Sequence, residues 1–289
     1  MASLKEIKAR IASVQSTLKI TSAMKMVASA KLHKVQGVAA SLAEYERRLA
    51  DIAAALTADP AVVASSPLSA EHEHPRRAIV VAFASDSSLC GAFNANAIRE
   101  LAREIEALRA EGFSEIEVWP AGEKIAQASL KAGYSVRMDF RRRGAMPAYD
   151  DAAEMARQLM ERYLSGAVDR VRLVYNHFYS MGHQAPRSET FLPADFSKLG
   201  ASETAAAPVD YIYEPDAARL LEALIPYTVR IRMYEVMLDS MTAEHAARMV
   251  AMQTATDNAQ ELLGDLTLTY NKRRQQAITD ELADITQAE

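Results

Sequence analysis

The stretch Met249-Val-Ala-Met-Gln-Thr-Ala-Thr-Asp-Asn-Ala-Gln-Glu-Leu-Leu-Gly-Asp-Leu266 decides the fold of this chain. It lies in a run from Tyr227 to Glu289 that contains no proline and a single glycine, so the run can remain helical over most of its length. Within the stretch, four small or apolar residues follow the spacing of a coiled-coil seam: Ala255, Ala259, Leu262 and Leu266. Because small residues occupy the middle of this stripe, a second helix can approach it closely.

The N-terminal region supplies a suitable second helix. Residues 3–57 contain no proline and one glycine, and Ser3 with Glu6 three positions later has the pattern of a helix-capping box. Its apolar stripe comprises Leu4, Ile7, Ile11, Val14 and Leu18, continues through Thr21, Lys25 and Ala28, and resumes at Val35, Val38, Leu42, Tyr45, Leu49, Ile52 and Leu56. A lone helix with this stripe would expose too much apolar surface, so we expect it to have a helical partner.

The C-terminal helix is predicted to extend from Asp216 to Ile285, which makes it longer than its N-terminal partner. Before the stretch quoted above, its stripe comprises Leu220, Leu224, Tyr227, Ile231, Tyr234, Leu238 and Met241. After that stretch, the stripe continues less strictly through Tyr270, Ile278, Leu282 and Ile285. The far end of this helix is therefore expected to project without a partner.

Between the two helices, the period of the apolar pattern changes. Ala78-Ile-Val-Val-Ala-Phe-Ala84 is a continuous apolar run of the kind that forms a buried parallel strand. Further strands are predicted near Glu115–Pro120, Ser135–Phe140, Val171–His177 and Ser188–Leu192, the last one antiparallel. Helices are predicted around Ala95–Ala110, Glu123–Ala132 and Tyr149–Leu164. This alternation predicts a doubly wound, Rossmann-like α/β domain inserted between two helices that form a long antiparallel coiled coil.

The expected organisation has four parts. They are an N-terminal coiled-coil helix at residues 1–58, a proline-rich linker at 59–76, an α/β domain at 77–208 and a C-terminal coiled-coil helix at 209–289. No apolar stretch approaches the ~18 residues of a membrane-spanning helix, and the N-terminus does not resemble a signal peptide. A single cysteine, Cys90, excludes an internal disulfide framework. These features indicate a cytoplasmic protein.

Charge is unevenly distributed along the chain, whose net charge is −5. From Ile7 to Ala43 there is no acidic residue, against six basic ones: Lys8, Arg10, Lys19, Lys25, Lys31 and Lys34. The run can be an ordinary solvated helix face, but its length favours an acidic partner surface. Sparse basic residues, little arginine and no aromatic residues argue against nucleic acid as the partner.

Three segments resemble the gamma subunit of bacterial F-type ATP synthase. Ile11–Lys31 is similar to that family's first helix, and Ala246–Ala259 and Tyr270–Leu282 are similar to its C-terminal helix. The order helix, α/β domain, helix extends the resemblance over the whole chain. It implies a central rotor shaft that couples ion-driven rotation of the membrane c ring to ATP synthesis on the beta subunits, with no catalytic site, cofactor or metal of its own.

The resemblance also implies partners and contact residues. The shaft would lie in the hexamer of alpha and beta subunits, while the base would contact the epsilon subunit and the c ring. This would occur on the cytoplasmic face of the bacterial cell membrane, without a span of its own. Contacts with beta are expected from Met24, Lys25, Arg274, Gln275 and Thr279. Contacts with the c ring and epsilon are expected from Lys31, His33, Lys34, Tyr211, Tyr213 and Glu214.

Two departures from the family pattern stand out. After the first strand the family has Ser-Asp-Arg-Gly-Leu-Cys-Gly-Gly, whereas this chain has Ser85-Asp-Ser-Ser-Leu-Cys-Gly-Ala92. Because two glycines are replaced, the turn is expected to differ or to be strained. The sequence also ends a few residues early relative to the pattern, which is expected to shorten the apolar tip.

Other interpretations remain open from the residues alone. Cys90 near the start of a helix suggests an α/β enzyme, although no phosphate-loop glycine pattern accompanies it. His72 and His74 suggest a metal site, although two histidines are few ligands. A third possibility is a static scaffold in which the coiled coil only tethers partners.

Overall fold

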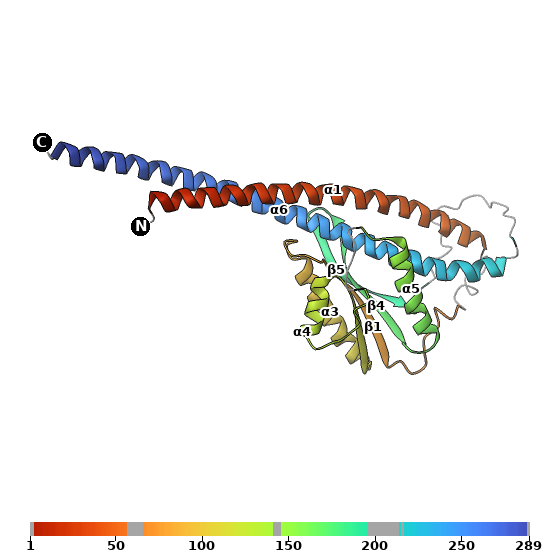
Figure 1. The fold of residues 1–289 in the computed structure, drawn as a ribbon. Coiled ribbons are helices and arrows are strands. Elements are labelled where there is room, and N and C mark those ends of the chain that lie inside the picture. The colour runs from red at the N-terminus through yellow and green to blue at the C-terminus, as the bar shows by residue number, and fades with distance from the viewer. Residues whose placement is uncertain (1–2, 57–65, 141–145, 196–213, 215–216, 288–289) are drawn as a thin grey trace. The chain divides into compact units, whose positions relative to one another are not determined.

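The computed structural model describes residues 3–56, 66–140, 146–195, 214 and 217–287. They fall into two compact units. The helical unit is Met1–Ala30 with Arg248–Glu289, and the sheet unit is Lys31–Ala247. Two long helices, α1 (Leu4–Leu56) and α6 (Ala217–Gln287), run through both units (Figure 1). None of the described helices has an apolar stretch long enough to cross a membrane.

The sheet unit contains a mixed five-stranded sheet. Its elements are β1 (Arg77–Phe83), α3 (Phe93–Ala110), β2 (Glu115–Ala121), α4 (Glu123–Lys131), β3 (Ser135–Val136), α5 (Tyr149–Leu164), β4 (Arg170–Ser180) and β5 (His183–Leu192). The strand order is β3-β2-β1-β4-β5, with the first four strands parallel and β5 antiparallel to β4. The predicted α/β fold, including its antiparallel return strand, is thereby confirmed.

Both faces of the sheet are buried, which explains the continuous apolar run of β1. Successive side chains of a strand point to opposite faces. Ala78, Val80 and Ala82 pack against residues of α3 and α4, whereas Ile79, Val81 and Phe83 join a core that includes α5 and α6. Figure 1 shows α3 and α4 on one side of the sheet and α5 on the other. A doubly wound arrangement thus follows from a strand with no polar face.

The third strand is shorter than predicted. The apolar pattern predicts Ser135–Phe140, but only Ser135 and Val136 pair with β2. Beyond them the ring of Phe140 stacks on Trp119, with centroids 5.6 Å apart and the planes inclined by 24°. The chain leaves the edge of the sheet because Phe140 contributes more to the core by stacking on a face than by extending a strand.

In each unit α1 and α6 pack together in antiparallel fashion. In the sheet unit, Val35 of α1 is buried with Leu238 and Met241 of α6, and further along α1 the hydroxyl of Tyr45 lies 2.9 Å from that of Tyr227. In the helical unit, Thr21 and Lys25 bond to Thr256 and Gln253 respectively. In both units residue numbers rise along one helix as they fall along the other, which confirms the predicted pairing.

The start of α1 and the seam of the helical unit test two details of the sequence pattern. Ser3 N donates to Glu6 Oε2 (2.8 Å) and Glu6 N donates to Ser3 Oγ (3.2 Å), which is the predicted capping box.

The prediction that Leu262 belongs to the seam is wrong, since its side chain is 48% exposed and its neighbour Leu263 is half-buried instead. Adjacent leucines satisfy two registers, and the chain adopts the one that alternates steps of four and three from Thr256 through Ala259 and Leu263.

Candidate functional site on the paired helices

The exposed end of α6 carries three of the residues expected to contact a partner. Arg274, Gln275 and Thr279 are exposed, as are all the side chains from residue 274 to residue 280. The Thr279 hydroxyl donates to the Gln275 carbonyl oxygen at 2.9 Å, within the helix itself. Among the residues that the structure describes, Arg274 has no hydrogen-bonded or ion-paired partner. Figure 1 shows this part of α6 extending past the first turn of α1 within the helical unit. Its side chains are therefore available to bind a second protein.

Met24 and Lys25 of α1 are half-buried rather than free. The Lys25 ammonium donates to Gln253 Oε1 at 2.9 Å, and Gln253 Nε2 donates to Asp257 Oδ1 at 2.7 Å. The predicted contact residue Lys25 thus already has a partner within the helical unit. Sequence spacing did not reveal that partner, because the two residues are 228 positions apart.

A group of exposed apolar residues on α1 was missed by the sequence reasoning. Ile20, Met26 and Val27 are 60%, 61% and 56% exposed. Ile20 and Val27 are seven positions apart, on one side of the helix, and lie outside the buried stripe. The seven-residue spacing of Ile20 and Val27 is present in the sequence, but it lies outside the stripe that predicts the helix pairing.

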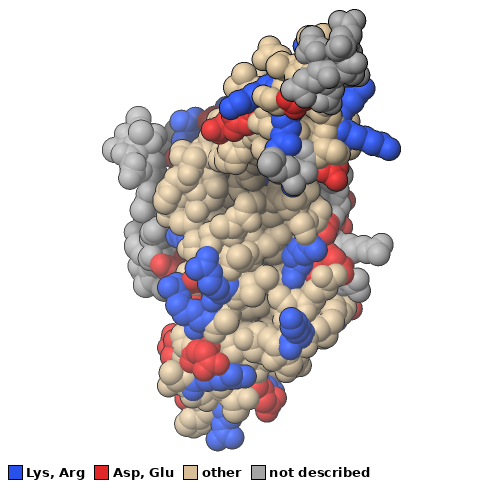
Figure 2. Space-filling view, turned by 90° about the vertical axis from the view of Figure 1, so that its left-hand side faces the viewer, with Lys and Arg blue, Asp and Glu red and all other residues tan. Residues whose placement is uncertain are grey.

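The surface of the helical unit is mixed in charge, not purely basic. On α1, Lys8, Arg10 and Lys19 are exposed. On α6, exposed acidic residues accompany them, including Asp257, Glu261 and Asp265. Figure 2 shows blue and red side chains together around the helix ends at the top of the view. The exposed basic residues of the acid-free run are therefore accompanied by exposed acidic residues of α6.

The residues expected to contact the c ring and epsilon are only partly described. Lys31, His33 and Lys34 are exposed on α1 in the sheet unit, and Glu214 is also exposed. Tyr211 and Tyr213 lie outside the described residues. Lys31 and Lys34 are three positions apart and share one side of the helix, whereas His33 does not.

The turn with Cys90, the rival candidate for an active site, is filled by its own side chains. Cys90 is 1% exposed, and Asn94 Nδ2 lies 3.2 Å from its sulfur. His177 does not serve as a base for the Cys90 thiol, because its Nδ1 lies 2.5 Å from Asp239 Oδ2. With these partners, Cys90 is a buried structural thiol.

The two positions where glycine is replaced are not strained themselves, but the turn holds the bulky residue Leu89 at a positive φ. Ala92 is the N-cap of α3, with φ −83° and ψ −1°, which any residue adopts. Ser88 is not among the described residues with positive φ; the positive φ values in this turn belong to Leu89 (67°) and Gly91 (59°). The glycine that is sterically required is Gly122, because a Cβ there would lie 2.0 Å from the Ala84 carbonyl oxygen.

Of the two histidines that suggested a metal site, His72 has a structural role, and His74 is exposed. His72 Nδ1 lies 2.9 Å from Asp169 Oδ1, and its ring stacks on Tyr163 at 4.6 Å. The other Asp169 oxygen accepts the backbone N–H groups of Arg76 and Arg77, and these bonds hold the pKa of Asp169 below its usual range although burial opposes them. No group of three potential metal ligands occurs in the described part of the chain.

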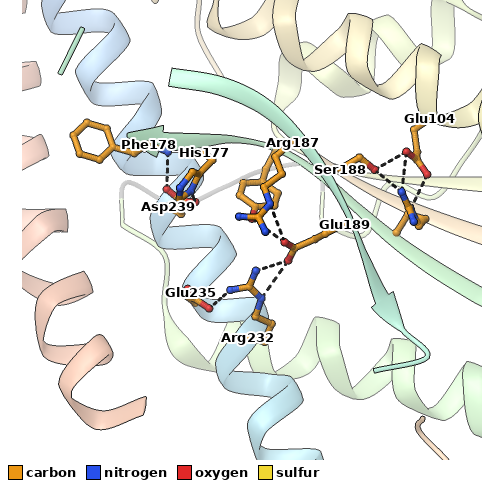
Figure 3. A network of polar contacts seen from close by, with 11 residues as sticks. Glu104, His177, Phe178, Arg187, Ser188, Glu189, Arg232, Glu235 and Asp239 are labelled. Atoms are coloured by element: carbon orange, nitrogen blue, oxygen red, sulfur yellow. Dashed lines mark hydrogen bonds and ion pairs between the residues drawn. The ribbon is translucent and has the colours of Figure 1, made fainter. Parts of the chain in front are cut away.

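A polar network fastens α6 to the sheet (Figure 3). The Asp239 carboxylate pairs with His177 and accepts the Phe178 N–H at 2.9 Å. About two helical turns before Asp239 on α6, Arg232 bonds Glu189 of β5 at 2.6 Å. Arg232 also pairs with Glu235, which lies one turn before Asp239. Burial opposes the charge on Arg232, but the two carboxylates outweigh it and raise its pKa. This network joins the helix to the sheet by hydrogen bonds and ion pairs.

Comparison with known proteins identifies the family. The family model described as ATP synthase matches residues 3–288. The chain is 49% identical over 286 residues to the ATP synthase gamma chain of Phocaeicola vulgatus, covering 99% of this chain and 98% of that one. It is 38% identical over 287 residues to that of Cytophaga hutchinsonii, covering 99% and 97%.

Solved structures support the fold. A chain in the Euglena gracilis mitochondrial ATP synthase OSCP/F1/c-ring structure, rotational state 3, is similar with a TM-score of 0.62 and 18% identity, covering 98% of this chain and 92% of that one. A chain in the central stalk/c-ring structure of the Tetrahymena thermophila mitochondrial enzyme has a TM-score of 0.56 and 22% identity, covering 82% and 99%.

A pair of long terminal helices with an inserted α/β sheet, matched over its whole length, defines the class: the chain belongs to the ATP synthase family. Within it, the chain is a gamma chain, the non-catalytic subunit that forms the central-stalk rotor of F-type ATP synthase.

Proposed function

We propose that the exposed end of α6 transmits force to the beta subunits through Arg274, Gln275 and Thr279, and that Met24 and Lys25 of α1 contact the beta subunits as well. The observation that carries this proposal is the exposure of every side chain from residue 274 to residue 280. A rotor needs contacts that form and break with angle. Exposed ion pairs contribute only ~0.2–1 kcal/mol each, which suits transient contacts.

In the sheet unit, a second set of residues is proposed to face the c ring and the epsilon subunit: Lys31, His33, Lys34, Tyr211, Tyr213 and Glu214. The exposure of the four described members supports this assignment. The division proposed with it is a coiled coil of residues 1–58 and 209–289, a linker at 59–76 and a base at 77–208. The chain would then be peripheral to the membrane, attached through the c ring.

The test is Arg274→Ala combined with Gln275→Ala in the assembled complex. We expect ATP-driven proton pumping in membranes to fall at least threefold while the amount of assembled complex stays unchanged. The matched control is Asn271→Ala with Lys272→Ala, which removes neighbouring exposed side chains of α6. Unchanged pumping in the first variant, or an equal loss in the control, contradicts the assignment.

A static tether is distinguished by locking the helix. Crosslinking the C-terminal part of α6 to a hexamer subunit should stall ATP synthesis if the chain rotates. A tether would be indifferent to the same crosslink.

A further inference from the structure

The middle of the helical unit is held by polar contacts in addition to buried apolar residues such as Ala28 and Met252. Thr256 Oγ1 donates to Thr21 Oγ1 at 2.9 Å, and the Thr21 hydroxyl in turn donates to the Leu18 carbonyl oxygen of its own helix. Thr21 is 9% exposed, so this contact lies at the seam itself. One helical turn away, Lys25 bonds Gln253. The two helices are therefore joined here by directional bonds.

The Gln253 amide links two opposite charges. Its oxygen accepts from the Lys25 ammonium at 2.9 Å, and its nitrogen donates to the Asp257 carboxylate at 2.7 Å. The amide oxygen faces the cation and the amide nitrogen faces the carboxylate, and this arrangement fixes the orientation of the amide. Asp257 lies one turn beyond Gln253 on α6, so the link joins one residue of α1 to two residues of α6.

Apolar seams alone specify the register of two helices weakly. A helix that slips by one turn, about 5.4 Å, presents a similar apolar stripe to its partner, whereas a polar residue in the seam is satisfied in one register only. Small residues flank this region, including Ala28 (2% exposed) on α1 and Ala259 (6%) on α6. They offer little shape to oppose sliding.

We propose that Lys25 is a positioning residue, which acts through Gln253 and Asp257 to fix the register of α1 against α6 so that the pair turns as one body. The Thr21–Thr256 bond reinforces the same register. This role goes beyond the proposed beta-subunit contact and does not depend on it, since both partners of Lys25 lie in this chain.

A charge exchange separates the two roles of Lys25. The variants are Lys25→Glu, Gln253→Lys and the two combined, each in the full chain assembled with alpha and beta subunits. Gln253→Lys places two ammonium groups face to face, and Lys25→Glu removes the cation from the link. The combined variant restores an ion pair across the helices, but its charge at position 25 has the opposite sign toward any acidic partner.

The first measurement is the separation of spin labels placed by cysteine substitution at Ser16 of α1 and Gln260 of α6, both exposed. Cys90, the chain's one cysteine, is buried and is not expected to compete for the label. We expect a narrow distance distribution in the parent chain and the combined variant. In each single variant it should broaden or shift by about 5 Å, one helical turn.

The second measurement is ATP-driven rotation of the complex, which is expected to fall at least threefold in each single variant and to return within twofold of the parent rate in the combined one. Lys19→Glu is the matched control, because it reverses an exposed charge of α1 that has no bonded partner among the described residues. It should leave the label distance unchanged.

Two results would overturn the proposal. A combined variant as impaired as Lys25→Glu alone would assign Lys25 to a contact with an acidic subunit. Single variants with the parent label distance and rotation rate would show that the register needs no such link. Should a single variant fail to assemble, Lys25→Met serves in its place, because it keeps the length of the side chain while removing the hydrogen bond to Gln253. An unchanged label distance in that variant also counts against the proposal.

Discussion

The helix α6 is held in two different ways along its length. In the sheet unit it is buried on two sides, since Leu238 and Met241 pack on α1 while Met233 and Val236 join the core of the sheet. In the helical unit α1 is the one described element beside it, and from residue 274 to residue 280 its side chains are exposed. One continuous helix can therefore be packed into a core along one part and present an exposed contact surface along another, because different elements cover the two parts.

The largest expected effect tests whether packing really differs between the units. Leu238→Ala removes a side chain that is 1% exposed, and should cost about 2–5 kcal/mol of unfolding free energy. Leu266→Ala makes the same change at a half-buried position of the helical unit, and should cost about 1 kcal/mol. Urea unfolding of the full chain, followed by circular dichroism, measures both. Equal losses would mean that the helical unit is packed as tightly as the sheet unit.

The next effect concerns the polar link between Asp239 of α6 and the strand β4. Asp239→Asn keeps the shape of the side chain but removes the carboxylate that contacts His177 and accepts the Phe178 N–H. The substitution should lower the free energy of unfolding by about 1–3 kcal/mol. Asp265→Asn is the control, an exposed carboxylate of the helical unit, and should change stability by less than about 0.5 kcal/mol. A neutral result for Asp239→Asn would leave apolar packing as the main attachment of α6.

A third prediction uses pH within the sheet unit. Burial, together with repulsion from Glu235, raises the pKa of Glu46 from 4.5 to about 7, although Arg232 opposes the shift. A carboxyl group whose pKa is higher in the folded state destabilises the fold as pH rises from about 4.5 to about 7, and the penalty is complete above that range. Glu46→Gln should therefore raise stability at pH 8 by about 1–2 kcal/mol, allowing for solvent screening, and should have no effect at pH 4.

Glu44, two residues away, is the control of opposite sign. Hydrogen bonds from Arg47 and Arg48 lower its pKa, so its contribution is present at neutral pH and is lost as pH falls through the lowered value. Glu44→Gln should slightly destabilise the chain at pH 8. A gain of stability in both variants would show that reduced net charge, not local burial, is the cause.

The smallest expected effect concerns the register of the helical seam. Leu262→Ser changes a side chain that is 48% exposed and should be nearly neutral, whereas Leu263→Ser should cost about 1 kcal/mol. Amide hydrogen exchange along α6 is the measurement, since protection should fall only in the second variant. The reverse order would restore the register with Leu262 in the seam.

Much of the fold is predictable because its sequence cues are local. The bounds of α5 agree with the prediction to the residue, and the capping box of α1 forms as its spacing predicts. The run of β1 identifies a strand with two buried faces. The prediction fails where the deciding contact is distant in the sequence. Phe140 stacks on Trp119 instead of extending β3, and the residues next to Phe140 do not indicate that contact.

The candidate site was less predictable for the same reason. The resemblance supplied Lys25 as a contact residue, but its bond to Gln253, 228 positions along the chain, depends on how the two helices align. The exposed group Ile20, Met26 and Val27 was within reach, since its spacing is visible in the sequence. The contacts proposed for Arg274, Gln275 and Thr279 remain predictions until the assembled complex is measured.

Trp119 is the chain's single tryptophan, and its ring is wholly buried, stacked on Phe140 with the guanidinium of Arg137 4.8 Å away. Intrinsic indole emission from this protein thus originates in the sheet unit alone. Melting of the free helix ends would leave that emission undisturbed, and a change in it would report opening of the base. The molecule therefore carries a native optical reporter that distinguishes loosening of its base from fraying of its tip.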